Sequence, residues 1–452
     1  MIAESILVRG RHVLTSATPA VVDDGAVLVV GESIADVGPY DELRAAHPDA
    51  GALGGPYDIV TPGFVNTHGH FSEGLLAGIG EQYTLGEWIH GLINPIAPHL
   101  TRAMAYVATM LSGIQMLRSG ITTANDMFVC EPRPEPVTPA VVTALDELGL
   151  RGVVSFGAGD LRSAGEVAPQ LAEHEALREA AAASRLCTFR VGIGAVGGQS
   201  DKLFAASADL AVRGGHGVHI HLHEVREEVT ATRQRFGVTP IAHCAREGLF
   251  TAPTLAAHCV WADRADRDLL ARHRVGVAHN PVANMILASG AAPVAELRAL
   301  GVDVGIGVDG AASNDSQDML QAVKATALLA RVHHLQATAM TAREAFEMAT
   351  IGGARALRMA ATVGSLEPGK AADLVVFDGS SPALANVHDP YEAVVYVAGS
   401  REVKDVLVAG RPSVADGDVV TVDVADLVAR SRPLARELVT RAGLSHLSEL
   451  AR

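Results

Sequence analysis

Two histidines separated by a single residue stand in the first part of the chain. His68 and His70 directly follow the strand-like run GFVNT. Residues two apart in an extended segment point to the same side, so both imidazole rings can reach one metal ion. Histidines at this spacing are also common as ordinary surface or core residues, so the pair alone does not establish a metal site.

A second cluster is the run His219-Ile220-His221-Leu222-His223-Glu224, which places three histidines on one face of a predicted strand that ends in a carboxylate. Only some of these side chains can be metal ligands. His219 would lie deeper in the fold, where we interpret it as an interior histidine that is structural or supports a ligand. His223 fits equally well as a plain loop residue.

Three further polar residues each follow an apolar, strand-like segment: His258 after TLAA, His279 after VGVA, and Asp309 after VGIGV. If these segments are parallel strands of one barrel, their carboxyl ends meet at one face. Imidazole nitrogen combined with carboxylate oxygen suits zinc or ferrous iron, whereas calcium and magnesium prefer mostly oxygen ligands. Such an ion can lower the pKa of water from about 15.7 to about 7, which predicts a hydrolase.

A site of this kind also needs a group that moves protons. Glu224 lies three residues beyond His221. It is the predicted general acid and base between water, a ring nitrogen and the leaving group. The alternative is an ordinary glutamate of a surface loop.

These side chains need a scaffold of repeated β-then-α units, and the sequence supplies one. Eight strand-like runs separated by Ala- and Leu-rich helical stretches predict an α/β fold with a (β/α)8 TIM-like barrel over residues 58–363. The runs are VTPGFVNTH, ITTANDMF, LRGVVSFG, FRVGIGAV, GVHIHLHE, LAAHCVW, VGVAHNP and VDVGIGVDG.

The two ends of the chain have a different pattern. Short strands punctuated by Gly and Asp in residues 1–57 and 364–420 predict one small β-sandwich domain, with the barrel inserted between its halves. Residues 421–452 predict a C-terminal helical segment that is interrupted near Pro433.

Composition narrows the class of protein. Of 452 residues, 48% are hydrophobic and 19% are charged, which is typical of a compact globular protein. The net charge of -15 argues against nucleic acid or an anionic membrane as a partner. Four cysteines without a CxxC pair, no signal-peptide pattern and no apolar run of about 18 residues predict a cytoplasmic protein.

Taken together, the motifs resemble the amidohydrolase superfamily, in its branch of cytosine-deaminase-like and triazine-hydrolase-like aminohydrolases. The resemblance extends over most of the chain. The matching stretches are TPGFVNTHGH, GITTANDMF, HIHLHE, LAAHCVW, AHNPVANMILASGAAPV, VGIGVDGAASNDSQDM and GSLEPGKAADLVVFD. The resemblance implies one divalent metal ion, zinc or iron, and the implied ligands are His68, His70, His221 and Asp309.

The resemblance also implies catalytic roles for three residues. Glu224 is similar to the family's proton shuttle, His258 to the histidine that orients the nucleophile, and Asp309 to a ligand that also accepts a proton from water. The implied enzyme is a hydrolase of carbon–nitrogen bonds other than peptide bonds. It would deaminate a cyclic amidine, an amino-substituted heterocycle of the purine, nucleoside, pterin, pyrimidine or triazine type, and release ammonia.

Within this branch, the pattern is most similar to S-adenosylhomocysteine and methylthioadenosine deaminases. Trp88 matches an aromatic residue that lines their pocket. Ala97 stands where those enzymes have a ribose-binding Glu, and Phe156 aligns with an arginine used for the amino-acid carboxylate. These departures predict that the usual substrate tail is not recognised here.

A further departure lies after the seventh predicted strand, where Ala283 and Ile286 replace the family's Ser and Lys. His279 and Asn280 remain and are predicted to contact the substrate. From the relatives we also expect a homo-oligomer, specifically a dimer.

Two alternatives stay open at this point. The same site could expel chloride or an alkylamine from a heterocycle, since activation of water does not fix the leaving group. A noncatalytic barrel that serves as a binding module is the alternative of another class. That alternative predicts eroded ligands, whereas all four predicted ligands, Glu224 and His258 are present.

Overall fold

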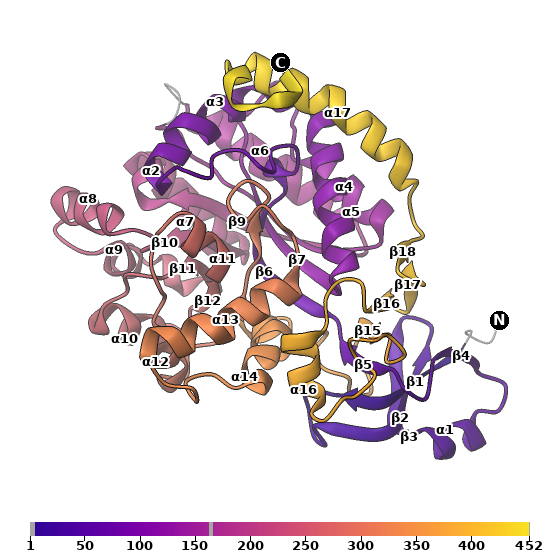
Figure 1. Ribbon diagram of the computed structural model, residues 1–452. Helices are drawn as coiled ribbons and strands as arrows, with labels where there is room; N and C mark the ends of the chain where they lie inside the picture. The colour runs from indigo at the N-terminus through magenta and orange to yellow at the C-terminus, as the bar shows by residue number, and fades with distance from the viewer. Residues whose placement is uncertain (1–4, 162–165, 452) are drawn as a thin grey trace.

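The computed structural model describes residues 5–161 and 166–451. Its largest element is a closed parallel barrel, shown in Figure 1 with helices around it. Pairing of β13 with β6 closes the ring, and the short strand β14 extends it beside β6. In chain order the strands are β6 (Phe64–His70), β7 (Ile121–Phe128), β8 (Arg151–Phe156), β9 (Cys187–Ala195), β10 (Gly217–Leu222), β11 (Thr254–His258), β12 (Gly276–His279), β13 (Val304–Ile306) and β14 (Asp309–Gly310). All eight predicted barrel strands are confirmed.

The helices that connect these strands, or follow the last of them, lie outside the barrel (Figure 1). The main ones are α4 (Arg102–Arg118), α5 (Pro139–Leu148), α6 (Val167–Ala183), α7 (Asp201–Gly214), α8 (Arg226–Phe236), α9 (Pro240–Arg246), α10 (Arg264–Arg272), α11 (Pro281–Ile286), α12 (Val294–Ala299), α13 (Met319–His334), α14 (Ala342–Glu347) and α15 (Gly353–Ala356). Helix α4 begins where the Thr101 side chain accepts a hydrogen bond from Met104 N–H. The chain turns at Gly120, whose φ is +85°.

A second sheet combines strands from both ends of the chain, as predicted. Its order is β18-β17-β16-β15-β5-β1-β2-β3, with β4 paired to β1. The strands are β1 (Ser5–Leu14), β2 (Val21–Val30), β3 (Ser33–Pro39), β4 (Gly51–Gly54), β5 (Ile59–Pro62), β15 (Leu374–Phe377), β16 (Val403–Val408), β17 (Arg411–Ala415) and β18 (Asp418–Val419). Figure 1 places this sheet beside the barrel, near the amino terminus.

The predicted first barrel strand is divided between the two sheets. β5 pairs with β1 and β15 of the small sheet, whereas β6 pairs with β7 of the barrel. Only Gly63 separates β5 from β6. A β-carbon at Gly63 would lie 2.0 Å from Thr122 Oγ1, so a residue without a side chain is required. The small sheet therefore extends to Pro62.

Two contacts fix the small sheet against the barrel. The Phe64 ring on β6 packs against Phe377 of β15, with ring centroids 6.4 Å apart. Arg151, at the start of β8, donates two hydrogen bonds to the Asp373 carboxylate at 2.9 and 3.0 Å. This bidentate geometry is directional, so it holds the start of β8 in a defined position beside β15.

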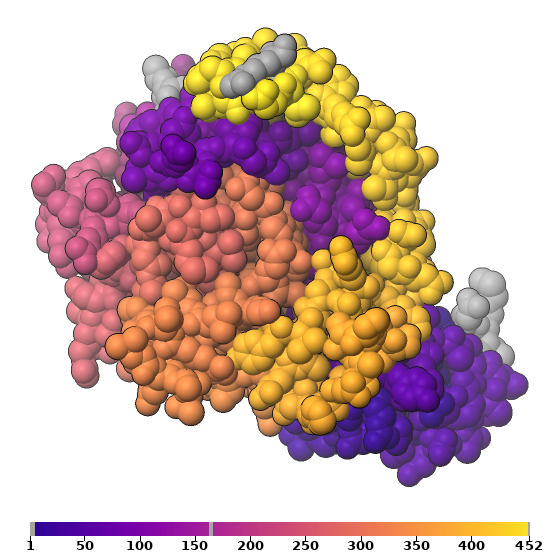
Figure 2. All heavy atoms as spheres, viewed as in Figure 1, coloured from indigo at the N-terminus to yellow at the C-terminus, as the bar shows by residue number. Residues whose placement is uncertain are grey.

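The C-terminal segment is helical, but helix α17 (Val424–Arg441) continues through Pro433 without the predicted interruption. Pro433 lies on the exposed side of the helix, as does Ala429, whose carbonyl would have received the missing hydrogen bond. Water can satisfy that carbonyl, which lowers the cost of the proline. Figure 2 shows this segment running over the molecular surface away from the small sheet. Among the described residues, no helix is both long enough and apolar enough to cross a bilayer.

Candidate active site

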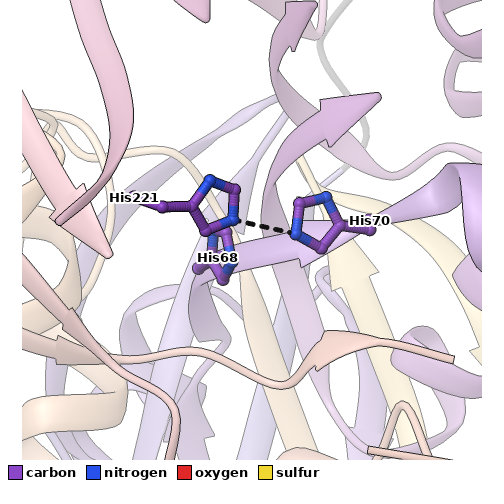
Figure 3. A group of neighbouring side chains, drawn as sticks. All are labelled: His68, His70 and His221. Carbon is purple, nitrogen blue, oxygen red and sulfur yellow. Dashed lines mark hydrogen bonds between the residues drawn. The ribbon is translucent and has the colours of Figure 1, made fainter. Parts of the chain in front are cut away.

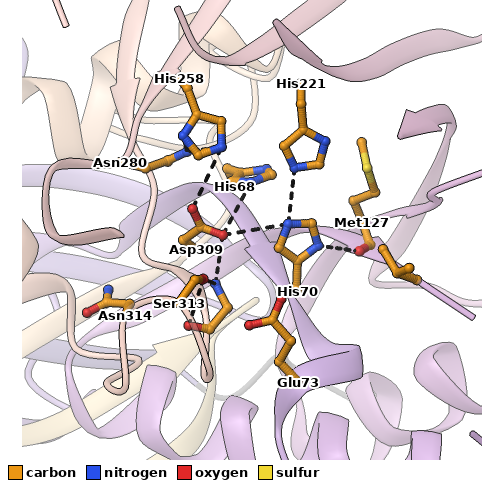
Figure 4. A network of polar contacts seen from close by, with 12 residues as sticks. His68, His70, Glu73, Met127, His221, His258, Asn280, Asp309, Ser313 and Asn314 are labelled. Atoms are coloured by element: carbon orange, nitrogen blue, oxygen red, sulfur yellow. Dashed lines mark hydrogen bonds and ion pairs between the residues drawn. The ribbon is translucent and has the colours of Figure 1, made fainter. Parts of the chain in front are cut away.

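Three histidines and one aspartate meet at the carboxyl ends of the barrel strands. His68 and His70 come from β6, His221 from β10 and Asp309 from β14 (Figure 3, Figure 4). The Asp309 Oδ1 atom lies 3.5 Å from His68 Nε2 and 3.6 Å from His70 Nε2. His68, His70 and His221 form one potential metal-binding group, and His68, His258 and Asp309 form another. The structure thus brings together the four predicted ligands.

The hydrogen bonds of His70 and His221 determine where their protons lie. His70 Nδ1 donates to the Met127 carbonyl at 2.6 Å, and His221 Nδ1 donates to the Gly194 carbonyl at 2.5 Å. Burial lowers the pKa of both rings, so both are neutral and carry no proton on Nε2. The two Nε2 atoms nevertheless face each other at 3.1 Å (Figure 3). Two lone pairs at this distance repel unless a cation lies between or beside them.

His68 is oriented by a chain of buried polar groups. One consistent arrangement of protons has His68 Nδ1 donating to His219 Nε2 at 2.8 Å and His219 Nδ1 donating to Ser155 Oγ at 3.1 Å. Ser155 in turn donates to the Asp126 carbonyl at 2.6 Å. His68 Nε2 is then unprotonated, and this buried atom has no hydrogen-bond partner among the described residues.

The charge states also suit a divalent cation. Burial lowers the pKa of His68 to about 4, despite the nearby carboxylate of Asp309. Burial acts to raise the pKa of Asp309, but His68, His258 and His70 together hold it well below its usual value. Neutral imidazoles and an ionised carboxylate are the ligand forms that zinc and ferrous iron bind. The residues present therefore fit one such ion.

His219 is fully buried and hydrogen-bonds to His68, as expected of an interior histidine that supports a ligand. We predict that His219→Leu weakens zinc binding about 10- to 100-fold, since partners that orient metal ligands typically contribute this much. A competition titration with a chromogenic chelator measures the effect.

His174→Leu is the matched control for that substitution. His174 is equally buried, its ring packs 5.3 Å from the Phe156 ring, and its nitrogens have no hydrogen-bond partner in the described part of the chain. The control should keep the zinc affinity of the unmodified protein. Equal losses in the two variants would show a general effect of removing a buried histidine.

Glu224 and His258 complete the polar side of the site. Burial, followed by the charge of Asp309, raises the pKa of Glu224 well above its usual value. His258 Nε2 lies 3.5 Å from Glu224 Oε2 and 3.8 Å from Asp309 Oδ2. The opposite nitrogen, Nδ1, hydrogen-bonds to Asn284 Oδ1 at 2.9 Å. His258 is thus held with its Nε2 edge toward both carboxyl groups.

A cavity of about 330 Å³ opens over these groups. One wall is polar and includes His70, His221, Glu224, His258 and Asp309. The other is apolar and includes Leu85, Trp88, Ile89, Ile93, Val129, Leu161 and Leu287. The Trp88 indole is anchored because its Nε1 donates to the Ala312 carbonyl at 3.1 Å. A small, largely apolar heterocycle would fit between such walls.

The structure separates the other predicted substrate contacts from this cavity. Asn280 is buried with its Nδ2 atom 3.2 Å from His258 Nδ1, so it lies behind His258. His279 borders a different, much smaller space near His334. Burial lowers the pKa of His279 to about 4. Neither residue belongs to the lining of the 330 Å³ cavity, nor does Ala97 or Phe156.

His223 has a structural role. It is fully buried, its Nδ1 hydrogen-bonds to the Trp261 carbonyl at 3.2 Å, and its Nε2 accepts from Ile241 N–H at 3.2 Å. Both ring nitrogens are therefore used, and neither is directed at the predicted ligands. His223 lies in the loop between β10 and α8, as the sequence allowed, but it is buried there and hydrogen-bonded on both sides of its ring.

Two glutamates that the sequence motifs did not single out, Glu73 and Glu228, also line the cavity. Burial and the charge of Asp309 raise the pKa of Glu73 well above its usual value. Burial raises the pKa of Glu228 to about 7, and its Oε2 accepts a hydrogen bond from Glu224 N–H at 3.0 Å. The available signals were spacings: Glu73 follows His70 by three residues, and Glu228 follows Glu224 by one helical turn.

A parallel barrel with imidazoles and a carboxylate gathered at the carboxyl ends of its strands is the arrangement of a metal-dependent barrel hydrolase. The amidohydrolase family model matches residues 59–413. The chain belongs to the amidohydrolase family, which confirms the predicted family, fold class and enzyme class.

Relatives of known sequence match nearly the whole chain. The 5-methylthioadenosine/S-adenosylhomocysteine deaminase of Pelotomaculum thermopropionicum is 35% identical over 443 residues, which cover 97% of this chain and 99% of that protein. The 5'-deoxyadenosine deaminase of Methanothermobacter thermautotrophicus is 35% identical over 437 residues, covering 96% and 99%. The match extends through the small sheet as well as the barrel.

Solved structures show the same architecture. An adenosine deaminase from Xanthomonas campestris with bound zinc superposes with a TM-score of 0.89 and 29% identity, covering 96% of this chain and 98% of that one. An atrazine chlorohydrolase from Arthrobacter aurescens complexed with zinc gives a TM-score of 0.87 and 24% identity, covering 95% and 100%. The latter similarity shows the fold alone.

Proposed function

We propose that this protein is a metal-dependent aminohydrolase that deaminates an amino-substituted nitrogen heterocycle of the purine-nucleoside type and releases ammonia. The observation that carries the proposal is the pair of facing Nε2 atoms of His70 and His221, 3.1 Å apart beneath a cavity of about 330 Å³. The substrate class rests on the relatives named as deaminases of adenosine, 5'-deoxyadenosine and 5-methylthioadenosine.

One zinc ion is the proposed cofactor, and the proposed ligands are His68, His70, His221 and Asp309. Such an ion would lower the pKa of a water molecule bound to it to about 7, and would so supply the nucleophile at neutral pH. Zinc is preferred to iron because the Xanthomonas campestris relative contains zinc.

Individual side chains of the site have separate proposed roles in the reaction. Glu224 is the proposed shuttle, because burial favours its protonated form and a protonated carboxyl can deliver a proton to a ring nitrogen. His258 is proposed to orient the attacking water through Nε2, and Asp309 to receive a proton from it. Trp88 is the proposed wall against one face of the heterocycle. Asn280 is proposed to act indirectly, through His258.

The test combines metal analysis with a screen for released ammonia. Protein purified without added metal should contain about one zinc per chain. We expect activity on an adenine nucleoside among adenosine, 5'-deoxyadenosine, 5'-methylthioadenosine, S-adenosylhomocysteine, adenine, a pterin, cytosine and an aminotriazine. Removal of zinc with 1,10-phenanthroline should abolish the activity, and added zinc should restore it.

Other outcomes would replace the proposal with a defined alternative. Chloride or alkylamine release from a substituted triazine, with no ammonia from any nucleoside, would identify the other leaving-group chemistry. A chain without stoichiometric zinc or iron would favour the noncatalytic binding module.

The proposed setting is a homodimer in the cytoplasm. All four cysteines are buried thiols that take part in no disulfide, which suits a reducing compartment. The dimer is proposed from the resemblance to the deaminases, and light scattering coupled to gel filtration tests it directly.

A further inference from the structure

Glu73 links two parts of the site that are far apart in sequence. It ends the short helix η1 (Phe71–Glu73), just after the strand that carries His70, and its residue exposure is only 2%. Its Oε2 atom accepts a hydrogen bond from Ala312 N–H at 3.0 Å. Figure 4 shows this carboxyl group turned toward Ser313, next to the Asp309 turn.

The contact between Glu73 and this turn leaves no room for a β-carbon beside Asp309 while Glu73 keeps its position. A β-carbon at Gly310 would lie only 1.9 Å from Glu73 Oε2. The carboxyl group thus occupies the space that a side chain would take at the residue after Asp309. Asp309 itself has φ of +59°, a conformation that L-residues adopt only when their surroundings hold them there.

The same turn is held from a second direction. Trp88 Nε1 donates to the carbonyl oxygen of Ala312, the residue whose N–H donates to Glu73. Asp315, just beyond the turn, accepts a hydrogen bond from Gly78 N–H at 2.6 Å. Residues 309–315 are therefore fixed to residues 73–88 at three points, and two of these points are side chains that line the cavity.

Building on the proposed function, we propose that Glu73 is a positioning residue that, together with Trp88, clamps the Ala312 residue and so fixes the Asp309 carboxylate for metal binding. Glu73 acts as a hydrogen-bond acceptor and transfers no proton. Glutamine can supply the same acceptor oxygen, whereas methionine has a similar shape without it. These two substitutions therefore separate positioning from proton transfer.

The experiment compares Glu73→Gln, Glu73→Met and the control Glu81→Gln. Glu81 is exposed and lies in the same segment. The readouts are the zinc dissociation constant, the absorption spectrum of the cobalt-substituted protein, and kcat and KM measured separately. Glu73→Met should weaken zinc binding by about 10- to 100-fold and alter the cobalt spectrum. Glu73→Gln and Glu81→Gln should stay close to the unmodified protein.

Two results would overturn the role of Glu73 and leave the proposed function intact. Equal loss of kcat in Glu73→Gln and Glu73→Met, with zinc retained, would make Glu73 a proton-transfer group. Unchanged zinc affinity and an unchanged cobalt spectrum in Glu73→Met would mean that the turn needs no clamp. Absence of zinc and of ammonia release in the unmodified protein would instead remove the proposed function.

A thermal melting curve shows whether the Glu73→Met variant is folded. If it is not folded, a second variant is needed. Trp88→Phe then tests the same clamp, because it removes the donor to the Ala312 carbonyl and keeps an aromatic ring in the cavity wall. Weaker zinc binding in Trp88→Phe supports the clamp, and unchanged binding overturns it.

Discussion

Glu224→Gln should leave the zinc content unchanged and lower kcat by about 10²- to 10⁴-fold, the usual contribution of a general acid–base group. Glutamine preserves the size of the side chain and can still accept the hydrogen bond from Ser289, which is 3.4 Å from Glu224 Oε1. It cannot gain or lose the proton. Steady-state kinetics on the best substrate of the ammonia screen, with metal analysis of the same sample, measures both quantities.

The matched control for this variant is Glu227→Gln. Glu227 is an exposed residue in the first turn of α8, three positions after Glu224. It should behave as the unmodified protein. Full activity of Glu224→Gln would exclude Glu224 as the proton shuttle, but it would not contradict the proposed metal site.

Asp309→Ala should reduce zinc affinity by more than about 100-fold, since loss of a ligand should exceed the 10- to 100-fold effect of losing a group that only orients one. The rate should fall with it even when zinc is added in excess, because the only carboxylate among the proposed ligands is gone. Metal content after dialysis, and kcat at saturating zinc, are the measurements.

Asp303→Ala serves as the control for Asp309→Ala. Asp303 directly precedes β13, at the opposite end of the barrel from the site, and its carboxylate is 3.4 Å from Arg358. This variant should retain zinc and activity. Undiminished zinc in Asp309→Ala would mean that the metal is held by the histidines without the aspartate.

The sequence was sufficient to predict which side chains would meet. His68, His70, His221, His258 and Asp309 each stand at the end of an apolar run, and the carboxyl ends of parallel strands in a barrel necessarily share one face. The apolar pattern therefore predicted that these strand ends meet, and the family resemblance implied that His221 is the ligand of its strand. The same reasoning could not divide the run around Gly63, because β5 and β6 are continuous in sequence and both are fully buried, and they are distinguished by the strands with which they pair.

Contacts between distant segments explain what was missed. The partner of Glu73 is Ala312, 239 residues away, and the spacing of Glu73 from His70 does not by itself show that its carboxyl group is buried. His279 was expected at the cavity because it ends β12, but its side chain lies beside a different space near His334. Which side of a short strand end faces the ligand depends on twist and packing that the sequence pattern does not contain.

The single-residue junction at Gly63 constrains how this enzyme can be re-engineered. A chimera that exchanged only the small sheet for that of a relative would have to keep β5 in the same position along the strand direction. The reason is that Gly63 is the single residue between β5 and β6. A slip of one position along the strand would turn Thr67 and Gly69 toward the metal in place of the two histidines. The peripheral sheet and the first ligand strand are thus best transplanted as a single module.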